Sequence, residues 1–368
     1  MISIKEVKSK KEFKQFIRYP RRLYKNCPYY VPSLEGDEYK TLTEHPALSF
    51  CDLRLWIAIK DGKIAGRIGG IINHRYNELK NKKRIRFGWF DVDNDIEVAK
   101  ALIETVENWG KEANLLEISG PSRYSNMEKQ GMLVDGFDVL TTMSSDYNYP
   151  YYPIFMDKLG YKKEEDYLQM EVEVKEIPES IKRMSNLLSE RYGIKVKEFK
   201  NKEEVASYAK QFFEALNKSF VNIYNFIPLT DSEIEYVIKS NFSMVDKDLM
   251  VVLVDKNERL VGFSLSIPSM SKAFRKAKGK LFPFGWYHIL KAFKKNDTVD
   301  LYLTGLLPEW SGRGIHALYH YQLHQNFLNK GYKYAITTQQ LESGKAYRVW
   351  ERYGGKIITR RRTYVKQN

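Results

Sequence analysis

Two glycines that precede a helix-like segment are the residues best suited to hold an anion. Gly312 and Gly314 follow a strand-like run that starts at Val299, and the helix-like run starts at Ala317. The first N–H groups of a helix lack partners inside it, and the positive end of the helix dipole attracts anions. Glycines leave room for a diphosphate, and Arg313 adds a positive charge. The spacing predicts a phosphate-binding loop; an ordinary surface turn is the alternative, which the surrounding elements must decide.

The segments around this loop alternate between strand-like and helix-like patterns. Period-two alternation predicts strands, and apolar residues three or four apart predict helices. In the second half of the chain, strands are predicted at 193–199, 249–254, 260–267, 299–304, 332–338 and 356–365. Helices are predicted at 203–218, after Asp231, at 317–329 and at 345–353. The segment 268–298 is a basic, aromatic insertion between two of these strands.

The first half has the same order of elements, β-α-β-β-β-α-β-α-β. Its strands are predicted at 2–7, 53–59, 63–72, 84–92, 115–119 and 166–174, and its helices at 10–24, 96–113 and 152–158. We therefore predict an α/β fold of two tandem units, 1–176 and 177–368, each with a mostly antiparallel, twisted sheet flanked by helices. Where the second unit has its glycines, the first has Asp93 and Asp95, whose carboxylates repel a diphosphate.

Length and composition exclude several classes of protein. A chain of 368 residues suits two domains, and 43% hydrophobic with 29% charged residues fits a globular protein. No apolar run approaches the roughly 20 residues that span a membrane, and the N-terminus lacks the apolar core of a signal peptide. Two cysteines, Cys27 and Cys51, provide neither a disulfide framework nor a metal site. We therefore expect a cytoplasmic protein.

Positive charge is concentrated in two places. The formal net charge is +14; the span 272–295 holds eight Lys or Arg and no acidic residue, and Arg360, Arg361 and Arg362 are consecutive. Such charge favours nucleic acid, anionic lipid or a polyanionic cofactor, or it forms a solvated basic surface. No nucleic-acid-binding motif accompanies it, so no specific nucleic-acid partner is predicted.

The glycine loop and a later segment resemble two motifs of the GNAT superfamily of acyl-CoA-dependent N-acyltransferases. The stretch 311–316 lies on the family's loop, Arg/Gln-x-x-Gly-x-Gly/Ala; it keeps Gly312 and Gly314, with Ser311 and His316 as departures. The stretch 343–355 lies on the second motif, Asn-x-x-Ala-x-x-x-Tyr-x-x-x-Gly-Phe. There Ala346 and Gly354 match, while Ser343, Trp350 and Gly355 depart. The resemblance covers 193–365, and the first half looks like a diverged second unit of a bacterial tandem-GNAT acetyltransferase.

The resemblance implies acetyl-CoA, or another acyl-CoA, as the acyl donor. It places these residues at the cofactor: Leu307, Ser311, Gly312, Arg313, Gly314, Ile315, His316, Ala317, Ser343, Ala346 and Trp350. In GNAT proteins the strand before the loop splays from the next strand, and a backbone N–H there stabilises negative charge on the carbonyl oxygen. The resemblance assigns this N–H to Leu306 or Leu307.

Proton transfer is the step for which the sequence departs from the family. GNAT enzymes often use the tyrosine of the second motif to protonate the leaving thiolate, and here that position holds Trp350. Tyr347 and Tyr353 lie one helical turn to either side, so each is a candidate acid, with core packing as the alternative role. Glu309 and Glu342 flank the site but are expected at the surface, so no general base is assigned.

Three histidines share one face of the helix that follows the loop. His316, His320 and His324 are spaced four residues apart, as zinc ligands on a helix can be. No glutamate of a metalloprotease motif accompanies them, and such spacing is common. A polar helix face is therefore predicted, without a metal.

The main hypothesis from the sequence is an acyl-CoA-dependent N-acetyltransferase acting on a small-molecule or peptide amine. Two alternatives stay open: a FemABX-like transferase that takes an aminoacyl group from charged tRNA, and a non-catalytic module that binds CoA or another ligand. A monomer with an internal pseudo-dimer is plausible.

Overall fold

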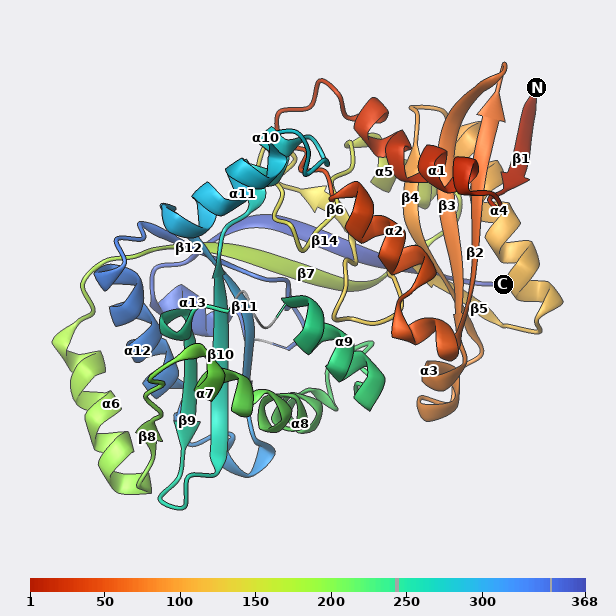
Figure 1. The fold of residues 1–368 in the computed structure, drawn as a ribbon. Coiled ribbons are helices and arrows are strands. Elements are labelled where there is room, and N and C mark those ends of the chain that lie inside the picture. The colour runs from red at the N-terminus through yellow and green to blue at the C-terminus, as the bar shows by residue number, and fades with distance from the viewer. Residues whose placement is uncertain (242–244, 345) are drawn as a thin grey trace.

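The computed structural model describes residues 1–241, 245–344 and 346–368 (Figure 1). The first half contains, in order, β1 (Ile2–Glu6), α1 (Lys10–Leu23), α2 (Glu35–Thr43), the 3-10 helix η1 (Pro46–Ser49), β2 (Cys51–Lys60), β3 (Lys63–Asn73), α3 (His74–Leu79), β4 (Arg84–Val92), α4 (Ile96–Glu112), β5 (Glu117–Gly120), β6 (Met132–Asp135), α5 (Tyr151–Lys158) and β7 (Lys162–Glu173). The predicted element order is confirmed; α2, η1, α3 and β6 are additions to it.

The second half begins with a helix that the sequence analysis did not predict, α6 (Glu179–Tyr192). It continues with β8 (Lys195–Val196), α7 (Lys202–Ser207), α8 (Ala209–Phe220), α9 (Asp231–Asn241), η3 (Lys247–Leu249), β9 (Met250–Val254), β10 (Leu260–Pro268), α10 (Ser271–Ala277), α11 (Gly285–Lys294), β11 (Thr298–Leu306), η4 (Pro308–Trp310), α12 (His316–Asn329), β12 (Tyr334–Thr337), β13 (Gln340–Leu341), α13 (Arg348–Arg352) and β14 (Lys356–Gln367). The helix predicted at 203–218 is interrupted at Tyr208. Lys345, where the helix of the second motif was predicted to begin, lies outside the described residues.

The strands of both halves join in one mixed sheet of 14 strands among the described residues. Its main path runs β1-β2-β3-β4-β5-β14-β7-β12-β11-β10-β9-β8, while β6 pairs with β14 and β13 pairs with β7. The last strand of each half therefore lies beside the other half. β7 pairs with β12 of the second half, and β14 pairs with β5 of the first. Figure 1 shows β7 and β14 side by side across the middle of the molecule.

Helices cover both faces of this sheet and form its cores. In the first half α4 packs on β2, β3 and β4 through a stripe of buried residues that includes Leu102, Val106 and Trp109. In the second half α12 and α8 contribute to separate apolar clusters, which both contain residues of β9 and β10. The strands β9 to β11 of the second half thus lie between two apolar layers. This packing holds β11 and the loop after it in place. No helix in the described part of the chain has the length and apolar character required to cross a bilayer.

The consecutive arginines at 360–362 belong to this framework, not to a basic surface. They lie on β14, where Arg361 is 1% exposed and burial lowers its pKa to about 10. Arg360 pairs with Glu342, and Arg362 pairs with Asp166 at 2.8 Å. Because these cations are buried or paired within the chain, neither of the two alternatives drawn from the sequence, an anion-binding surface or a solvated basic surface, applies to these three residues.

Candidate functional site

The strand before the glycine loop separates from its neighbour halfway along its length. β11 and β12 run parallel and pair from Thr298↔Tyr334 to Leu301↔Thr337. One more backbone bond follows, from Thr338 N–H to the Leu301 carbonyl at 3.1 Å. From Tyr302 to Leu306, β11 has no ladder to β12 in the part of the chain that the structure describes. The two strands therefore leave an opening between them.

The pairing of β11 with β10 determines which backbone groups face this opening. The N–H of Leu307 donates to the carbonyl of Val261 at 3.0 Å, so these residues form a hydrogen-bonded antiparallel pair. Hydrogen-bonded and non-bonded pairs alternate, so Leu306, opposite Gly262, directs its N–H and C=O away from β10. By the same alternation, the backbone N–H and C=O of Thr304 point toward the opening. Of the two backbone donors expected from the sequence, the N–H of Leu306 faces the opening and that of Leu307 is already bonded.

The glycine loop has an open, left-handed backbone directly before α12. Gly312 and Gly314 have φ of 75° and 78°, which a residue with a side chain rarely adopts. A Cβ on Gly312 would meet no atom within 4 Å, and one on Gly314 would meet only the Leu188 side chain at 3.8 Å. Among the described residues, no carbonyl or side chain accepts the N–H groups from 312 to 316. Such an array of unpaired donors suits an anion.

The side chains of the loop divide between solvent and core. Ser311 and Arg313 are exposed, and the Arg313 guanidinium lies 5.2 Å from the ring centroid of Trp310. Ile315 is fully buried in the core beneath α12, and Ala317 is 9% exposed. Ile315 can therefore contact a bound cofactor through its backbone only.

Part of the second motif packs against the helix that follows the loop. The ring of Trp350 meets that of His320 edge-on at 4.5 Å, and Tyr353 lies 5.9 Å from the same histidine. Leu306 packs against the same apolar cluster. Burial raises the pKa of Tyr353, so its hydroxyl keeps its proton at neutral pH. Tyr353 thus lies with the β11 opening and the loop on one side of the sheet.

The other residues expected from the second motif lie apart from this group. Ser343 is exposed, and its hydroxyl donates to Glu165 on β7 at 2.6 Å. Ala346 is exposed, and the half-buried Tyr347 is absent from the described contacts around α12. Of the two candidate acids, Tyr353 therefore lies closer to the loop helix.

The flanking carboxylates and the histidine series offer no base or metal site. Glu342 bonds to Arg360, which lowers the pKa of its carboxyl, and Glu309 is exposed. His324 contacts the carbonyl of Lys175, away from His320. Burial, aided by His316, lowers the pKa of His320 to about 3 and keeps its ring neutral. No group of three metal-binding side chains occurs within residues 1–241, 245–344 and 346–368.

A buried carboxylate that the sequence analysis missed lies between the two halves. Glu128 belongs to the long loop between β5 and β6, and burial raises its pKa to about 8. Both carboxylate oxygens are shielded from solvent, and neither accepts a hydrogen bond from a described residue. Its neighbour Met127 packs against the cluster that contains Tyr302 of β11. Burial and then the charge of Glu128 raise the pKa of Tyr302.

A histidine from the first half faces this carboxylate. Nε2 of His45 lies 3.3 Å from Oε1 of Glu128. Nδ1 of His45 accepts the N–H of Ala47 at 3.1 Å, so in the neutral ring the proton is on Nε2, toward Glu128. Burial lowers the pKa of His45 to about 4, and its ring stacks on Tyr124. The geometry thus holds one fixed N–H next to one carboxyl group of raised pKa.

Comparisons with solved structures identify the fold. The glucosamine N-acetyltransferase region of a fungal multi-domain GH3 β-N-acetylglucosaminidase matches 100% of this chain with a TM-score of 0.61 and 12% identity. A tandem GNAT protein from the clavulanic acid biosynthesis pathway also matches 100% of the chain, with a TM-score of 0.58 and 11% identity. The chain has a tandem GNAT fold. It spans 38% of the length of the fungal protein and 98% of the length of the clavulanic acid pathway protein.

Sequence comparisons find relatives of this chain. No family model matches it. Protein YghO of Escherichia coli (strain K12) is 26% identical over 307 residues, which cover 82% of this chain and 78% of that protein. Bacterial ceramide synthase of Caulobacter vibrioides is 25% identical over 300 residues, which cover 80% of this chain and 77% of that protein.

The N-terminal GNAT unit has the same kind of splayed strand pair, but the chain itself fills the opening. β4 and β5 pair only from Arg84 to Arg86 among the described residues. Beyond that point the Phe87 carbonyl accepts the N–H of Ser122 at 2.8 Å, and the N–H of Val92 donates to the Tyr152 hydroxyl at 2.8 Å. Two β4 groups beyond the ladder, the Phe87 carbonyl and the Val92 N–H, are therefore already paired.

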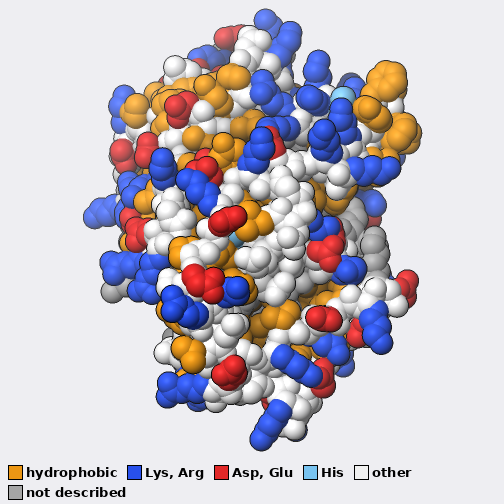
Figure 2. Space-filling view, turned by 90° about the vertical axis from the view of Figure 1, so that its left-hand side faces the viewer, with side chains coloured by type: hydrophobic (Ala, Val, Ile, Leu, Met, Phe, Trp, Pro, Cys, Tyr) orange, Lys and Arg blue, Asp and Glu red, His pale blue; other side chains and the backbone are white. Residues whose placement is uncertain are grey.

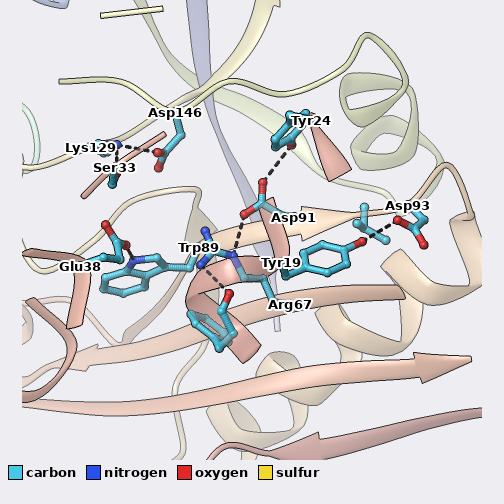
Figure 3. Close-up of polar contacts among 12 residues, drawn as sticks. Tyr19, Tyr24, Ser33, Glu38, Arg67, Trp89, Asp91, Asp93, Lys129 and Asp146 are labelled. Carbon is cyan, nitrogen blue, oxygen red and sulfur yellow. Dashed lines mark hydrogen bonds and ion pairs between the residues drawn. The ribbon is translucent and has the colours of Figure 1, made fainter. Parts of the chain in front are cut away.

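A network of buried charges lies next to this filled opening in the N-terminal GNAT unit (Figure 3). Arg67 pairs with Asp91 at 2.7 Å, and Arg123 pairs with both Glu38 and Asp146, at 3.1 and 3.2 Å. Lys129 donates to Asp146 at 2.9 Å and to Ser33 at 2.8 Å. Burial raises the pKa of Asp91, whereas Arg123 and other cations hold the pKa of Glu38 below its usual value although burial opposes its ionisation.

Two cavities border this network, and their size limits what they can hold. They have volumes of about 30 and 20 Å³ and share Asp91, Arg123, Asp146 and Tyr147 in their walls. Each has space for one or two water molecules. Neither can hold an amine substrate or a CoA, so the network has the character of a structural element of the N-terminal unit.

Proposed function

We propose that this tandem GNAT protein is an acyl-CoA-dependent N-acyltransferase whose acyl donor binds in the C-terminal unit. The observation that carries the proposal is the contrast between the two splayed strand pairs. In the N-terminal unit Ser122 and Tyr152 occupy the exposed groups of β4. The corresponding groups of Thr304 and Leu306 have no partner among the described residues. An extended pantetheine arm can hydrogen-bond to such an edge as an added strand does.

The residues of the C-terminal unit fit the two ends of an acyl-CoA. The unpaired N–H groups of the loop from Gly312 to His316 suit the pyrophosphate, and the exposed Arg313 adds attraction. The donor supplies an activated acyl group as a thioester. The N–H of Leu306 is aimed at the opening, where it can stabilise the negative charge that develops on the acyl carbonyl oxygen. One such donor typically contributes about 3 kcal/mol to lowering the barrier.

Glu128 and Tyr353 are the proposed proton acceptor and proton donor. When the amine nitrogen bonds to the acyl carbon, the C–S bond breaks, the nitrogen loses a proton and the sulfur leaves as a thiolate. A carboxylate whose pKa is raised to about 8 is a stronger base than an ordinary one, and the fraction of Glu128 that is ionised and able to accept the proton grows as the pH rises toward 8. Nε2 of His45 lies 3.3 Å from this carboxyl group. Tyr353, which keeps its proton, is proposed to protonate the thiolate.

The name of one relative favours a long-chain amine as the acceptor. A protein that is 25% identical over most of the chain is called bacterial ceramide synthase. A ceramide is the amide of a fatty acid and a long-chain amine, so its formation can be an N-acyl transfer. We therefore favour a fatty acyl-CoA and a long-chain amine as substrates. Acetyl transfer from acetyl-CoA to a small-molecule or peptide amine is the alternative that the sequence motifs suggest.

Calorimetric titration of the intact protein with CoA, acetyl-CoA and palmitoyl-CoA tests donor binding. We expect binding of all three, because the loop contacts the part they share. Release of free thiol is then measured with sphinganine and with a lysine peptide as acceptors. Absence of CoA binding would overturn the proposal.

The two alternatives give different results in the same assays. Amide formation from aminoacyl-tRNA without CoA would identify a FemABX-like transferase. CoA binding without thiol release, for either acyl-CoA and either amine, would support a binding module. The unfilled loop and strand edge favour the acyl-CoA enzyme, because a tRNA-dependent transferase has no use for a pyrophosphate cradle.

A further inference from the structure

The insertion between β10 and β11 exposes large apolar side chains on a short stretch of chain. Six side chains between 281 and 290 are between 43% and 77% exposed: Leu281, Phe282, Phe284, Trp286, Tyr287 and Leu290. Phe282 and Phe284 are 77% and 71% exposed. In the described part of the chain, all the exposed Phe and Trp side chains lie in this stretch. Isolated apolar side chains are normal on a surface, but a contiguous group of this size marks an interaction site.

Positive charges surround this group, and the span 272–295 supplies no negative charge. Between Lys272 and Lys295 there are seven Lys and one Arg and no Asp or Glu. All eight side chains are exposed. Lys272 pairs with Asp297, and the other seven have no ion pair in the described part of the chain. Figure 2 shows hydrophobic side chains protruding at its upper right, with Lys and Arg side chains around them.

The insertion is fixed to the body of the protein, so its exposed side chains are held in place. Ser271, Ala273 and Ala277 bury one side of α10. The carbonyl of Lys278 accepts from Arg21 of α1 at 3.2 Å, and the carbonyl of Gly279 accepts the N–H of Glu35 at 3.0 Å. At its C-terminal end the Asn296 amide donates to the Ser269 carbonyl at 2.7 Å. The apolar face is thus presented by a framework attached to both units.

We propose that the insertion, residues 269–297, docks the protein on the surface of an anionic lipid bilayer. Aromatic and leucine side chains enter the boundary between headgroups and acyl chains, while Lys and Arg attract acidic headgroups. This attraction falls off within a short distance of the surface and is weakened by salt. Charge composition decides against a protein partner, because lysine is depleted in protein–protein interfaces and seven of the eight cations are lysines.

Docking adds to the proposed function without depending on it. The evidence for docking comes from the insertion alone, whereas the evidence for acyl transfer comes from β11, the glycine loop and Glu128. The proposed function favours a long-chain amine as the acceptor, and such an amine dissolves in a lipid bilayer. If that part of the proposed function holds, docking brings the enzyme to the membrane that contains its acceptor. CoA binding and vesicle binding are measured separately, so failure of one does not imply failure of the other.

Sedimentation with large unilamellar vesicles tests the docking. We expect the full chain to sediment with vesicles of phosphatidylcholine mixed with phosphatidylglycerol, to stay in the supernatant with phosphatidylcholine alone, and to be released by high salt. A variant with Phe282→Ser, Phe284→Ser and Trp286→Ser should lose most of this binding. Its matched control is Leu79→Ser, Leu116→Ser and Ile154→Ser, which removes side chains of 53% to 59% exposure elsewhere and should bind as the natural protein does.

A second pair of variants separates charge from apolar contact. Lys291→Glu, Lys294→Glu and Lys295→Glu should abolish sedimentation at low salt. Lys83→Glu, Lys111→Glu and Lys158→Glu change the net charge equally, on exposed lysines outside the insertion, and should retain it. Equal binding by test and control variants, or failure to bind the anionic vesicles, would overturn the proposal. Tighter binding to single-stranded RNA than to vesicles would also overturn the proposal, if the variant with Phe282→Ser, Phe284→Ser and Trp286→Ser loses that binding. In that case the aromatic side chains would stack on RNA bases.

Discussion

Nε2 of His45 lies 3.3 Å from Oε1 of the Glu128 carboxyl group, at a place where the two units of the fold meet. His45 is the N-cap of the 3-10 helix η1 in the first unit, and Tyr236 of α9 in the second unit packs edge-on against its ring. A carboxyl group of raised pKa is therefore enclosed by both units. In the proposed function this carboxyl group supplies the proton acceptor that the motif positions lack.

Replacing Glu128 by Gln should remove activity while leaving the fold intact. If Glu128 accepts the amine proton, Glu128→Gln lowers kcat by about 100-fold or more. CoA binding should be unchanged, because the loop is untouched. Asp300→Asn is the matched control: Asp300 is another buried carboxyl, with a pKa raised by burial to about 7, and it lies on β11 with 4% exposure. Equal loss of kcat in both variants would point to general disturbance of β11.

The same glutamate should make the protein less stable at alkaline pH. The folded-state pKa of Glu128 is about 8, against an ordinary value of 4.5, so between these pH values the folded state keeps a proton that the unfolded state releases. Stability therefore falls as pH rises from 4.5 to 8, by at most about 5 kcal/mol. Glu128→Gln should raise the unfolding midpoint at pH 8.5 and have little effect near pH 4.5. If the variant and the natural protein have the same unfolding midpoint at pH 8.5, the carboxyl group is not desolvated.

A side chain in the glycine loop should block CoA binding. Gly314→Glu forces a side chain onto a residue with φ of 78° and places a carboxylate among the N–H groups of the loop. We expect the affinity for CoA to fall at least tenfold in calorimetry. Gly160→Glu is the control, because Gly160 has φ of 80° and equally open surroundings but lies after α5 in the N-terminal unit. It should lose similar stability through backbone strain and bind CoA normally.

The two tyrosines of the second motif should differ in their effect on turnover. Tyr353→Phe removes the hydroxyl that lies near α12 and should lower kcat about tenfold or more without a matching change in KM. Tyr347→Phe should have little effect. Rate measurements with a series of acyl thioesters check the assignment, because a thiol of lower pKa leaves without an acid and should restore the Tyr353→Phe rate.

Breaking the buried charge network should destabilise the N-terminal unit. Arg123→Met leaves Glu38 and Asp146 without a shared cation and should cost about 3–5 kcal/mol in denaturant unfolding. Arg18→Met breaks a more exposed pair with Glu35 and should cost less than about 1 kcal/mol. If the two variants lose similar amounts of unfolding free energy, the network contributes no more to stability than surface ion pairs do.

The order of elements could be predicted from the sequence because each element carries its own pattern. Strands such as Arg84–Val92 and helices such as Ile96–Glu112 were predicted almost to the residue. α6 was missed because its apolar residues do not all face a core: Met184 and Leu187 are 51% and 65% exposed. The exchange of β7 and β14 could not be predicted, since strand neighbours depend on contacts between residues far apart in the sequence, such as Lys162 and Val365, which are 203 positions apart.

The candidate site could be predicted from the sequence only where residues close together in the chain form it. Gly312 and Gly314 have the left-handed conformations that a glycine loop requires, and both are recognisable by type and spacing. Glu128 carries no such signal, because it is one acid in an irregular loop. Its raised pKa arises from burial against segments near residues 45, 236 and 302, which are distant in the sequence. Their meeting depends on how the two units pack, which no local pattern reveals.

The strand exchange has a consequence for synthesis on the ribosome. β14 is made after the other strands of this sheet, fills the gap between β5 and β7, and contributes the buried Tyr364 to the core of the N-terminal unit. The N-terminal unit therefore cannot complete its sheet before β14 has been made. Its β5 edge stays open until then, so a nascent chain, or one terminated before β14, presents an unpaired strand to chaperones and proteases. Synthesis of this one strand then joins the sheets of both units.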